Sequence, residues 1–272
     1  MRKPALVALV AIVLVGGSLY HYRRLLWPDP RGAHVTRYTL TSRLLGRNLG
    51  EIVVAPRGGG RDRPVLVFLH GRGGGPSSLL TDAFYKALAD LGPRAPAVVL
   101  VNGGDHSYFH DRADGPWGRY VLEEAIPEGI RRLGADPRRL AIAGISMGGF
   151  GALDLAIQHP GRFCAVGGQS AALWRTGGET PAGAFDDATD FGRNDVLGIA
   201  RARHRALGRT RVWISVGRDD PFYAATAELA SILRAHGQPL HYYAGPGGHS
   251  FHTFWTQAPA ALRFYAAALA AC

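Results

Sequence analysis

The sequence of 272 residues predicts an α/β domain with a mostly parallel central sheet and helices on both faces. Strand-like apolar runs alternate with helix-like segments along most of the chain, which is the pattern of a parallel sheet. The run 65–69 is apolar without interruption, as in a strand buried on both faces. A strand that ends at Gly144 passes through a tight glycine-serine-glycine turn into a helix. Ligands of such sheets bind at the carboxyl ends of the strands.

The first 27 residues are predicted to be a signal peptide or an N-terminal membrane anchor. Two basic residues precede an apolar run from about Ala5 to Tyr20, and Arg23 and Arg24 follow it. A basic start before an apolar run is typical of export segments. The run is short for a spanning helix, which needs roughly 17–25 residues. No clear cleavage site follows, so an uncleaved anchor is favoured slightly over a cleaved signal, with a buried helix as the alternative. An anchor or a signal would place the domain outside the cytoplasm.

A proline-rich linker over residues 28–33 leads into a domain that is expected to span residues 34–272. Residues 34–45 and 48–54 alternate apolar and polar side chains, which predicts two antiparallel edge strands. Further strands are expected at 65–70, 97–101, 140–144, 163–167, 211–216 and 240–244. Helices are expected at 79–91, 118–133, 150–158, 223–236 and 253–271, with a short cap insertion at 175–193.

Ser146 is the candidate nucleophile, because it occupies the centre of a Gly-x-Ser-x-Gly turn. Gly144 and Gly148 remove side chains that would collide in so tight a turn. The helix that follows would point its free N–H groups at the reaction centre. An ordinary glycine-rich turn explains these five residues equally well, so the rest of the chain has to decide.

A serine hydroxyl needs a base and a group that orients the base. His249 is the candidate base, because it lies in a glycine-rich loop after the last predicted strand; His252 is its weaker rival. Asp220 is the candidate orienting acid, and its neighbour Asp219 is interpreted as a structural or solvent-facing residue. A polar turn that caps the next helix is the simpler interpretation of both acids. The order serine, aspartate, histidine along the chain is that of many hydrolases.

The candidate oxyanion hole consists of the backbone N–H groups of Met147 and Arg72. Met147 follows the candidate nucleophile, and Arg72 lies in the glycine-rich loop 70–75 after a buried strand. A phosphate cradle is the alternative for this loop, but the loop lacks the Gly-Lys-Ser/Thr sequence of such cradles.

Four residues after strand ends are candidates to line the substrate cleft, and packing in the core explains the last of them equally well. They are His70, His106, Tyr108 and Trp174.

The formal net charge is +10, but the arginines are scattered, which argues against a nucleic-acid partner. The densest region, 201–211, is the best candidate for contact with an anionic surface, although a solvated helix face is the simpler interpretation. For Cys164 and Cys272, two free thiols are favoured over a disulfide. The chain has no metal-binding cysteine or histidine spacing, so no metal or other cofactor is expected.

Four segments taken together resemble the esterase D-type branch of the α/β hydrolases. They are residues 69–74, 117–127, 144–153 and 247–255. This branch includes formylglutathione hydrolases, feruloyl esterases and secreted mycolyltransferases, and the resemblance covers residue 34 to the C-terminus. It implies an acyl-serine mechanism on carboxylic esters. Formylglutathione hydrolases are usually cytosolic, and mycolyltransferases usually have Asp-Gly where this chain has His70-Gly71, so the chain looks like a sibling of both groups.

The sequence therefore predicts an extracytoplasmic serine esterase, with cell-envelope lipid or glycan esters as the expected substrates. An acyltransferase that moves the acyl group to a sugar or lipid alcohol is the first alternative. A serine peptidase and a non-catalytic binding protein of the same fold are the others. The expected partners are the ester substrate and, through the N-terminal segment, a membrane; the oligomeric state is left open.

Overall fold

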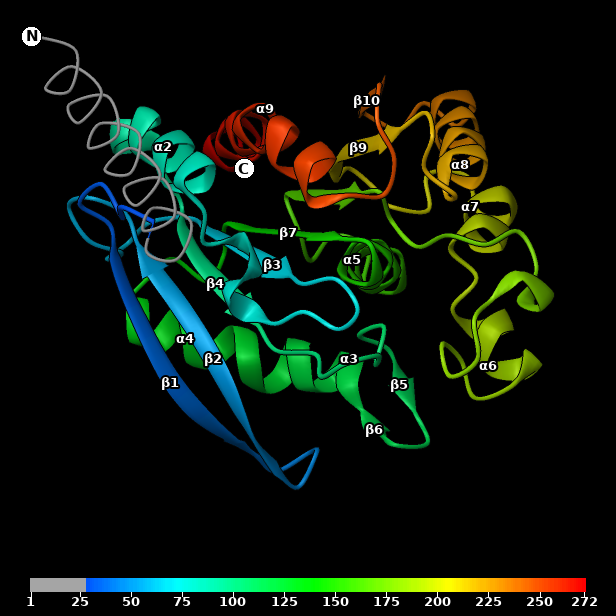
Figure 1. Cartoon of the computed structure of the whole chain (residues 1–272), viewed down its shortest axis with the longest axis horizontal. Coiled ribbons are helices and arrows are strands. Elements are labelled where there is room, and N and C mark those ends of the chain that lie inside the picture. Colours follow the sequence, from blue (N-terminus) through cyan, green and yellow to red (C-terminus); the bar gives the residue numbers. More distant parts are fainter. Residues whose placement is uncertain (1–27) are drawn as a thin grey trace, which may run out of the picture.

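In the computed structural model, residues 28–272 are described, and the predicted signal peptide or anchor at residues 1–27 lies outside them. An eight-stranded sheet forms the centre of the molecule (Figure 1). Its first two strands are antiparallel to their neighbours and the other six are parallel, as predicted. In spatial order the strands are β1 (His34–Ser42), β2 (Arg47–Ala55), β4 (Ala97–Val101), β3 (Val65–Leu69), β7 (Leu140–Ile145), β8 (Ala165–Gln169), β9 (Arg211–Gly217) and β10 (Leu240–Gly245).

Helices cover both faces of the sheet. On one face lie α2 (Asp82–Asp90) and α9 (Phe251–Ala270), which contact each other. The other face is covered by α3 (Trp117–Tyr120), α4 (Ile126–Leu133), α5 (Met147–Gln158), α7 (Val196–Ala202) and α8 (Tyr223–Ala235). Side chains of β3 alternate between the two resulting cores, with Val67 in one and Phe68 in the other. This double burial explains why the strand is apolar throughout.

Several elements differ from the sequence prediction. The segment 117–133 is helical throughout, but a π-helical turn (Val121–Ala125) joins α3 to α4. The helix α6 (Ala188–Arg193) in the predicted cap insertion, and α7 after it, were not predicted. Asp187 caps α6 and Asp195 caps α7, each by accepting a backbone N–H with its side chain. A small hairpin, β5 (Asp111–Arg112) with β6 (Gly115–Pro116), was also missed.

Cys164 and Cys272 are joined by a disulfide, so the expectation of two free thiols is wrong. The two residues are 108 positions apart in the sequence, and their Cα atoms lie 5.8 Å apart. They meet because α9 runs back along the sheet and ends beside the start of β8. The disulfide therefore links the last helix to the central sheet.

Within residues 28–272, no helix is both long and apolar enough to cross a membrane.

A carboxyl group is buried inside α5. Asp154 is 1 % exposed, and its Oδ1 accepts a hydrogen bond from Gln158 at 3.4 Å. Burial raises the pKa of Asp154 to about 8. The folded protein thus holds this proton more tightly than the unfolded chain does. The stability that the protonated Asp154 carboxyl contributes to the folded state is fully present below the ordinary carboxyl pKa. It is lost as the pH rises through the raised pKa of about 8.

Replacing Asp154 by asparagine is expected to raise the melting temperature at pH 8 by about 2–6 °C and to change it little at pH 4. The amide keeps the shape of the protonated carboxyl but has no proton to lose. Thermal denaturation from pH 4 to 9 measures the effect, with the exposed Asp90→Asn as the matched control. Burial also raises the pKa of Glu51 to about 8, so the melting temperature of the variant keeps part of its pH dependence. Identical pH dependence in variant and wild type would contradict the prediction.

Candidate active site

Ser146 stands between β7 and α5 in a strained conformation, with φ 53° and ψ −115°. Its N–H donates to the carbonyl of Gln169 at 3.0 Å, which fixes the turn against β8. A Cβ on Gly144 would lie 2.2 Å from the carbonyl oxygen of Gly148, and a Cβ on Gly148 would lie 2.1 Å from that of Leu69. Only glycine fits at either position. The steric argument made from the sequence holds for Gly144, whose collision lies within the turn, whereas the collision at Gly148 is with the backbone at the end of β3.

His249 bridges the serine and an aspartate. Its Nε2 lies 2.9 Å from the Oγ of Ser146, and its Nδ1 lies 2.9 Å from Oδ2 of Asp220. Ser146, Asp220 and His249 follow the carboxyl ends of β7, β9 and β10. These strands are parallel, so the three residues meet at one edge of the sheet, as predicted. The geometry is that of a nucleophile, a base and the group that orients the base.

Asp220 is buried and held in place by two bonds. Its Oδ1 accepts the backbone N–H of Phe222 at 2.9 Å, and its Oδ2 is paired with His249. Burial acts to raise the pKa of Asp220. The hydrogen bonds from His249 and from the Phe222 N–H nevertheless hold it below its usual range. A carboxylate that stays ionised keeps the Nδ1 proton of the imidazole in place.

The two rival residues lie elsewhere. Asp219 is exposed, and its backbone N–H donates to the carbonyl of Gly247 at 3.1 Å, so it joins the aspartate loop to the histidine loop. His252 is exposed in the first turn of α9. The ring of His249 instead packs edge-on against Phe222 and Phe254, each at 5.3 Å between centroids. Sequence reasoning missed these two aromatic supports, although Phe222 follows the predicted acid by only two positions.

The glycine-rich loop after β3 lies against the serine. The position of a Cβ on Gly71 would be 3.6 Å from the Cβ of Ser146, so the next N–H, that of Arg72, is close to the reaction centre. Met147 is the first residue of α5. Among the described residues, neither of these two N–H groups has a hydrogen-bond acceptor. Both can therefore donate to a developing negative charge, and their role as an oxyanion hole stays a prediction.

His70 does not line an open cleft, which corrects the sequence prediction. It is 1 % exposed, its Nδ1–H donates to the carbonyl of Gly71 at 2.8 Å, and its Nε2 accepts the N–H of Gly103 at 3.0 Å. Burial lowers the pKa of His70, which keeps the ring neutral and suited to these two opposite roles. The bond from Gly103 joins the loop after β3 to the loop after β4, and a second bond between these loops runs from the N–H of Gly73 to the carbonyl of Asp105 at 3.0 Å. His70 is therefore a positioning residue for the loop that carries Arg72.

Replacing His70 by alanine is expected to lower kcat for ester hydrolysis by about 10- to 100-fold, because the loop loses two of its tethers and one oxyanion donor shifts. KM should change less than kcat. Steady-state kinetics on a soluble ester measure the split, with the exposed and remote His34→Ala as control. Equal effects on KM and kcat, or a loss explained by a lower melting temperature, would contradict a positioning role.

The other three candidate cleft residues differ in exposure. His106 is exposed beside the cap insertion, and its carbonyl accepts a bond from Arg112 at 2.9 Å. Tyr108 and Trp174 are only 3 % and 8 % exposed and pack together at 5.6 Å between centroids. Trp174 also contacts Phe222 at 5.7 Å, which connects this pair to the ring beside His249. A role in substrate binding stays a prediction for all three, and the two buried rings would act by supporting the wall.

The parallel sheet, the strained serine after β7 and the histidine that bridges it to an aspartate define an α/β hydrolase with a Ser-His-Asp triad. A family model describes the same region more specifically. The model of the Esterase family matches residues 42–265, and the chain belongs to this family. This membership confirms the resemblance seen in the four sequence segments.

Curated relatives come from mycobacteria. Esterase Rv1288 of Mycobacterium tuberculosis strain H37Rv is 26% identical over 284 residues, which covers 90% of this chain and 62% of that protein. The chain thus spans less than two thirds of that relative's length. The MPT51/MPB51 antigen of Mycobacterium bovis is 28% identical over 229 residues, with 71% of this chain and 75% of the antigen covered.

Solved structures share the fold. A ferulic acid esterase superposes with a TM-score of 0.76 at 21% identity, covering 87% of this chain and 99% of that one. An S-formylglutathione hydrolase from Agrobacterium tumefaciens gives 0.73 at 18% identity, covering 88% and 96%. At such identities the likeness shows the α/β-hydrolase fold alone.

Proposed function

We propose that the protein is a serine esterase that works through an acyl-enzyme. His249 Nε2 takes the proton of Ser146 as the Oγ attacks the ester carbonyl carbon. The N–H groups of Met147 and Arg72 bind the oxyanion, and Asp220 holds the Nδ1 proton of the imidazolium. The alcohol leaves with the proton from His249. A water then repeats the sequence on the acyl-serine and releases the acid.

The observation that carries this proposal is that His249 forms two hydrogen bonds at once. Its Nε2 lies 2.9 Å from the Oγ of Ser146, and its Nδ1 lies 2.9 Å from Oδ2 of Asp220. A non-catalytic binding protein of this fold would gain nothing from a buried aspartate aligned on the far side of the ring. A strained backbone at Ser146 would likewise serve no purpose in it. The geometry therefore favours an enzyme over a binding module.

An acyltransferase is the second candidate. The side chain of His249 is 29% exposed, so the triad opens to the surface. An alcohol acceptor can reach the acyl-serine at such a site as readily as water can. The same residues would serve, with the acceptor hydroxyl in place of water and His249 as its base.

We place the enzyme outside the cytoplasm, on lipid or glycan esters of the cell envelope. The disulfide between Cys164 and Cys272 supports this location, because such bonds persist in oxidising compartments. The basic and apolar N-terminal sequence supports it independently. Mass measurement of the protein isolated from its native cells would show whether the N-terminus is intact, and whether the two thiols are oxidised there. A cytosolic protein with two free thiols would overturn this part of the proposal.

The activity is tested with a fluorophosphonate probe and a substrate series. The purified chain should become labelled, and it should cleave acyl esters of one or several chain lengths. Adding trehalose or another sugar separates the two candidates, because acyl transfer that outruns hydrolysis identifies a transferase. Absence of labelling would overturn both candidates in favour of a binding protein. Faster turnover of a peptide than of every ester would identify a peptidase.

A further inference from the structure

Arginines line the edge of the sheet that lies opposite the triad. The amino ends of parallel strands share one edge, and the triad occupies the other. Five adjacent strands, β4, β3, β7, β8 and β9, each have an arginine within the three positions before their first residue. In spatial order these are Arg94, Arg63, Arg139, Arg162 and Arg209. Arg139 is paired with Asp136 at 2.8 Å, and the other four form no ion pair within residues 28–272. A row of mostly unpaired positive charge therefore crosses the sheet at its amino-end face.

One hollow on this face lies beside the disulfide. It has a volume of about 630 Å³, and no aspartate or glutamate lines it. Arg138 at its rim is paired with Asp136. Arg209 and Arg211 are exposed and form no ion pair within residues 28–272. Together with Arg162 they give this hollow four arginines.

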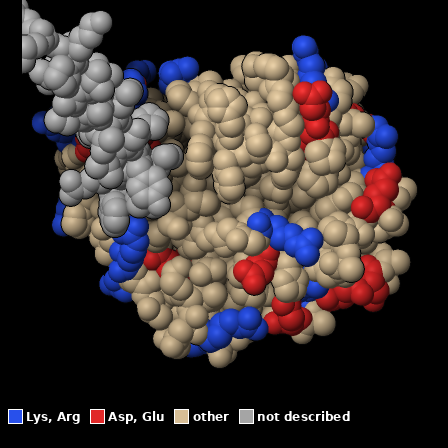
Figure 2. Space-filling view, viewed as in Figure 1, with Lys and Arg blue, Asp and Glu red and all other residues tan. Residues whose placement is uncertain are grey.

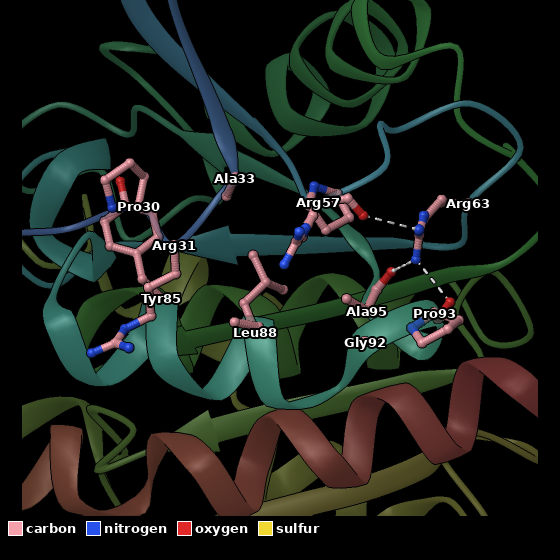
Figure 3. A pocket seen from close by; sticks show the side chains of 12 residues that line it. Pro30, Arg31, Ala33, Arg57, Arg63, Tyr85, Leu88, Gly92, Pro93 and Ala95 are labelled. Carbon is pink, nitrogen blue, oxygen red and sulfur yellow. Dashed lines mark hydrogen bonds between the residues drawn. The ribbon is translucent and has the colours of Figure 1, made fainter.

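The second hollow lies on the same face, between α2 and the first residues of the described chain. It has a volume of about 340 Å³, and again no acid lines it (Figure 3). The guanidinium of Arg63 donates to the carbonyls of Pro93 and Ala95 at 2.8 and 3.0 Å, so its charge is not neutralised. Arg31 and Arg57 are exposed, and neither is paired with a described acid. Pro30, Ala33 and Arg31 place the entry of the chain into the domain at this hollow.

The charge is unevenly distributed over the molecule. In Figure 2 the coloured side chains along the left margin, where β2 ends, are mostly blue, whereas blue and red side chains are mixed in the right half. The aromatic residues that line the hollows, Phe163 and Tyr85, are only 3 % and 4 % exposed. Bases of a single-stranded nucleic acid would have no ring to stack on. The face can recognise phosphate groups by charge but offers nothing to read bases.

We propose that the amino-end face of the sheet, defined by these two hollows, docks onto the phosphate headgroups of an anionic phospholipid bilayer. Guanidinium groups pair with phosphates through two hydrogen bonds, and a row of them fits a surface of many such groups. Docking in this orientation turns the triad away from the bilayer, toward substrates that approach from the aqueous side. It also brings the first residues of the described chain, at Pro30 and Arg31, to the membrane side.

The test compares binding of the purified full-length chain to phosphatidylcholine vesicles with and without phosphatidylglycerol. The N-terminal segment is the same in every variant, so differences between variants report on the domain. Arg209→Gln combined with Arg211→Gln should weaken binding to the anionic vesicles by about fivefold for each arginine removed, and Arg57→Gln with Arg94→Gln should do the same. Binding to neutral vesicles should not change. The wild-type preference for anionic vesicles should decrease as salt is raised.

The matched control replaces Arg43 and Arg218, two exposed arginines at the opposite edge of the sheet, by glutamine. This variant should bind the anionic vesicles within twofold of wild type. Equal binding by all three double variants would overturn the proposal, as would displacement of the wild type from vesicles by duplex DNA at lower phosphate concentration. Circular dichroism and the melting temperature of each variant show whether the fold is intact. Since binding is measured without ester turnover, failure of this proposal and failure of the proposed activity give different results.

Discussion

Replacing Ser146 by alanine is expected to lower kcat for ester hydrolysis by about 10⁴- to 10⁶-fold. The reason is that the Oγ forms the bond to the acyl group, and no other hydroxyl lies within hydrogen-bond distance of His249 Nε2 among the described residues. The oxyanion donors and the binding surface remain, so a residual rate above that in water should persist. The variant should also lose covalent labelling by a fluorophosphonate. Mass spectrometry and steady-state kinetics on one soluble ester measure both effects.

The control for this variant is Ser231→Ala, which removes an exposed hydroxyl from α8. It should keep full activity and labelling. The melting temperature of Ser146→Ala should lie within a few degrees of wild type, because the alanine must adopt the same φ of 53°. A variant that keeps more than about one hundredth of the wild-type kcat, or is labelled equally, would show that another nucleophile does the chemistry.

The parts of the site that the sequence predicted are those fixed by local sterics. Gly144 can be interpreted from the chain alone, because the collision that it avoids, with the carbonyl of Gly148, lies within one turn. Gly148 also avoids the carbonyl of Leu69 at the end of β3, a contact between distant segments that the sequence does not show. The order of Ser146, Asp220 and His249 could be predicted for a related reason. In a parallel sheet the residues that follow the strands all lie at the same edge. Three residues that follow three strand ends are therefore expected to lie close together.

The parts that the sequence did not predict depend on contacts between distant segments. His70 looked like a cleft residue because nothing in its neighbourhood shows that Gly103, 33 positions later, donates to its ring. The pairing of Cys164 with Cys272 depends on where α9 ends relative to β8. By contrast, α6 and α7 had a local signal, since Asp187 and Asp195 each stand at a helix start. Both helices are too short for their apolar periodicity to stand out.

Replacing Asp220 by asparagine is expected to lower kcat by about 10⁴-fold with a much smaller change in KM. The amide oxygen can still accept the N–H of Phe222, so the loop should keep its shape. The amide NH₂ would then face His249 Nδ1, which favours the tautomer whose Nε2 carries the proton and cannot accept one from Ser146. In the wild type, the pKa of Asp220 lies below its usual range, so the carboxylate stays ionised. The stability it contributes is present above the ordinary carboxyl pKa and is lost only as the pH falls through the lowered value.

The adjacent carboxyl provides the matched control for this prediction. Asp219→Asn changes an exposed side chain one position away and leaves the backbone bond to Gly247 in place, so kcat should stay within about threefold of wild type. Measured rates from pH 5 to 9 should show Asp220→Asn recovering partly at high pH, where hydroxide can take the proton that the misoriented imidazole cannot. If both asparagine variants lost activity equally, the two carboxylates would act through the charge of the loop. The alignment of Asp220 with His249 would then not be what makes Ser146 a nucleophile.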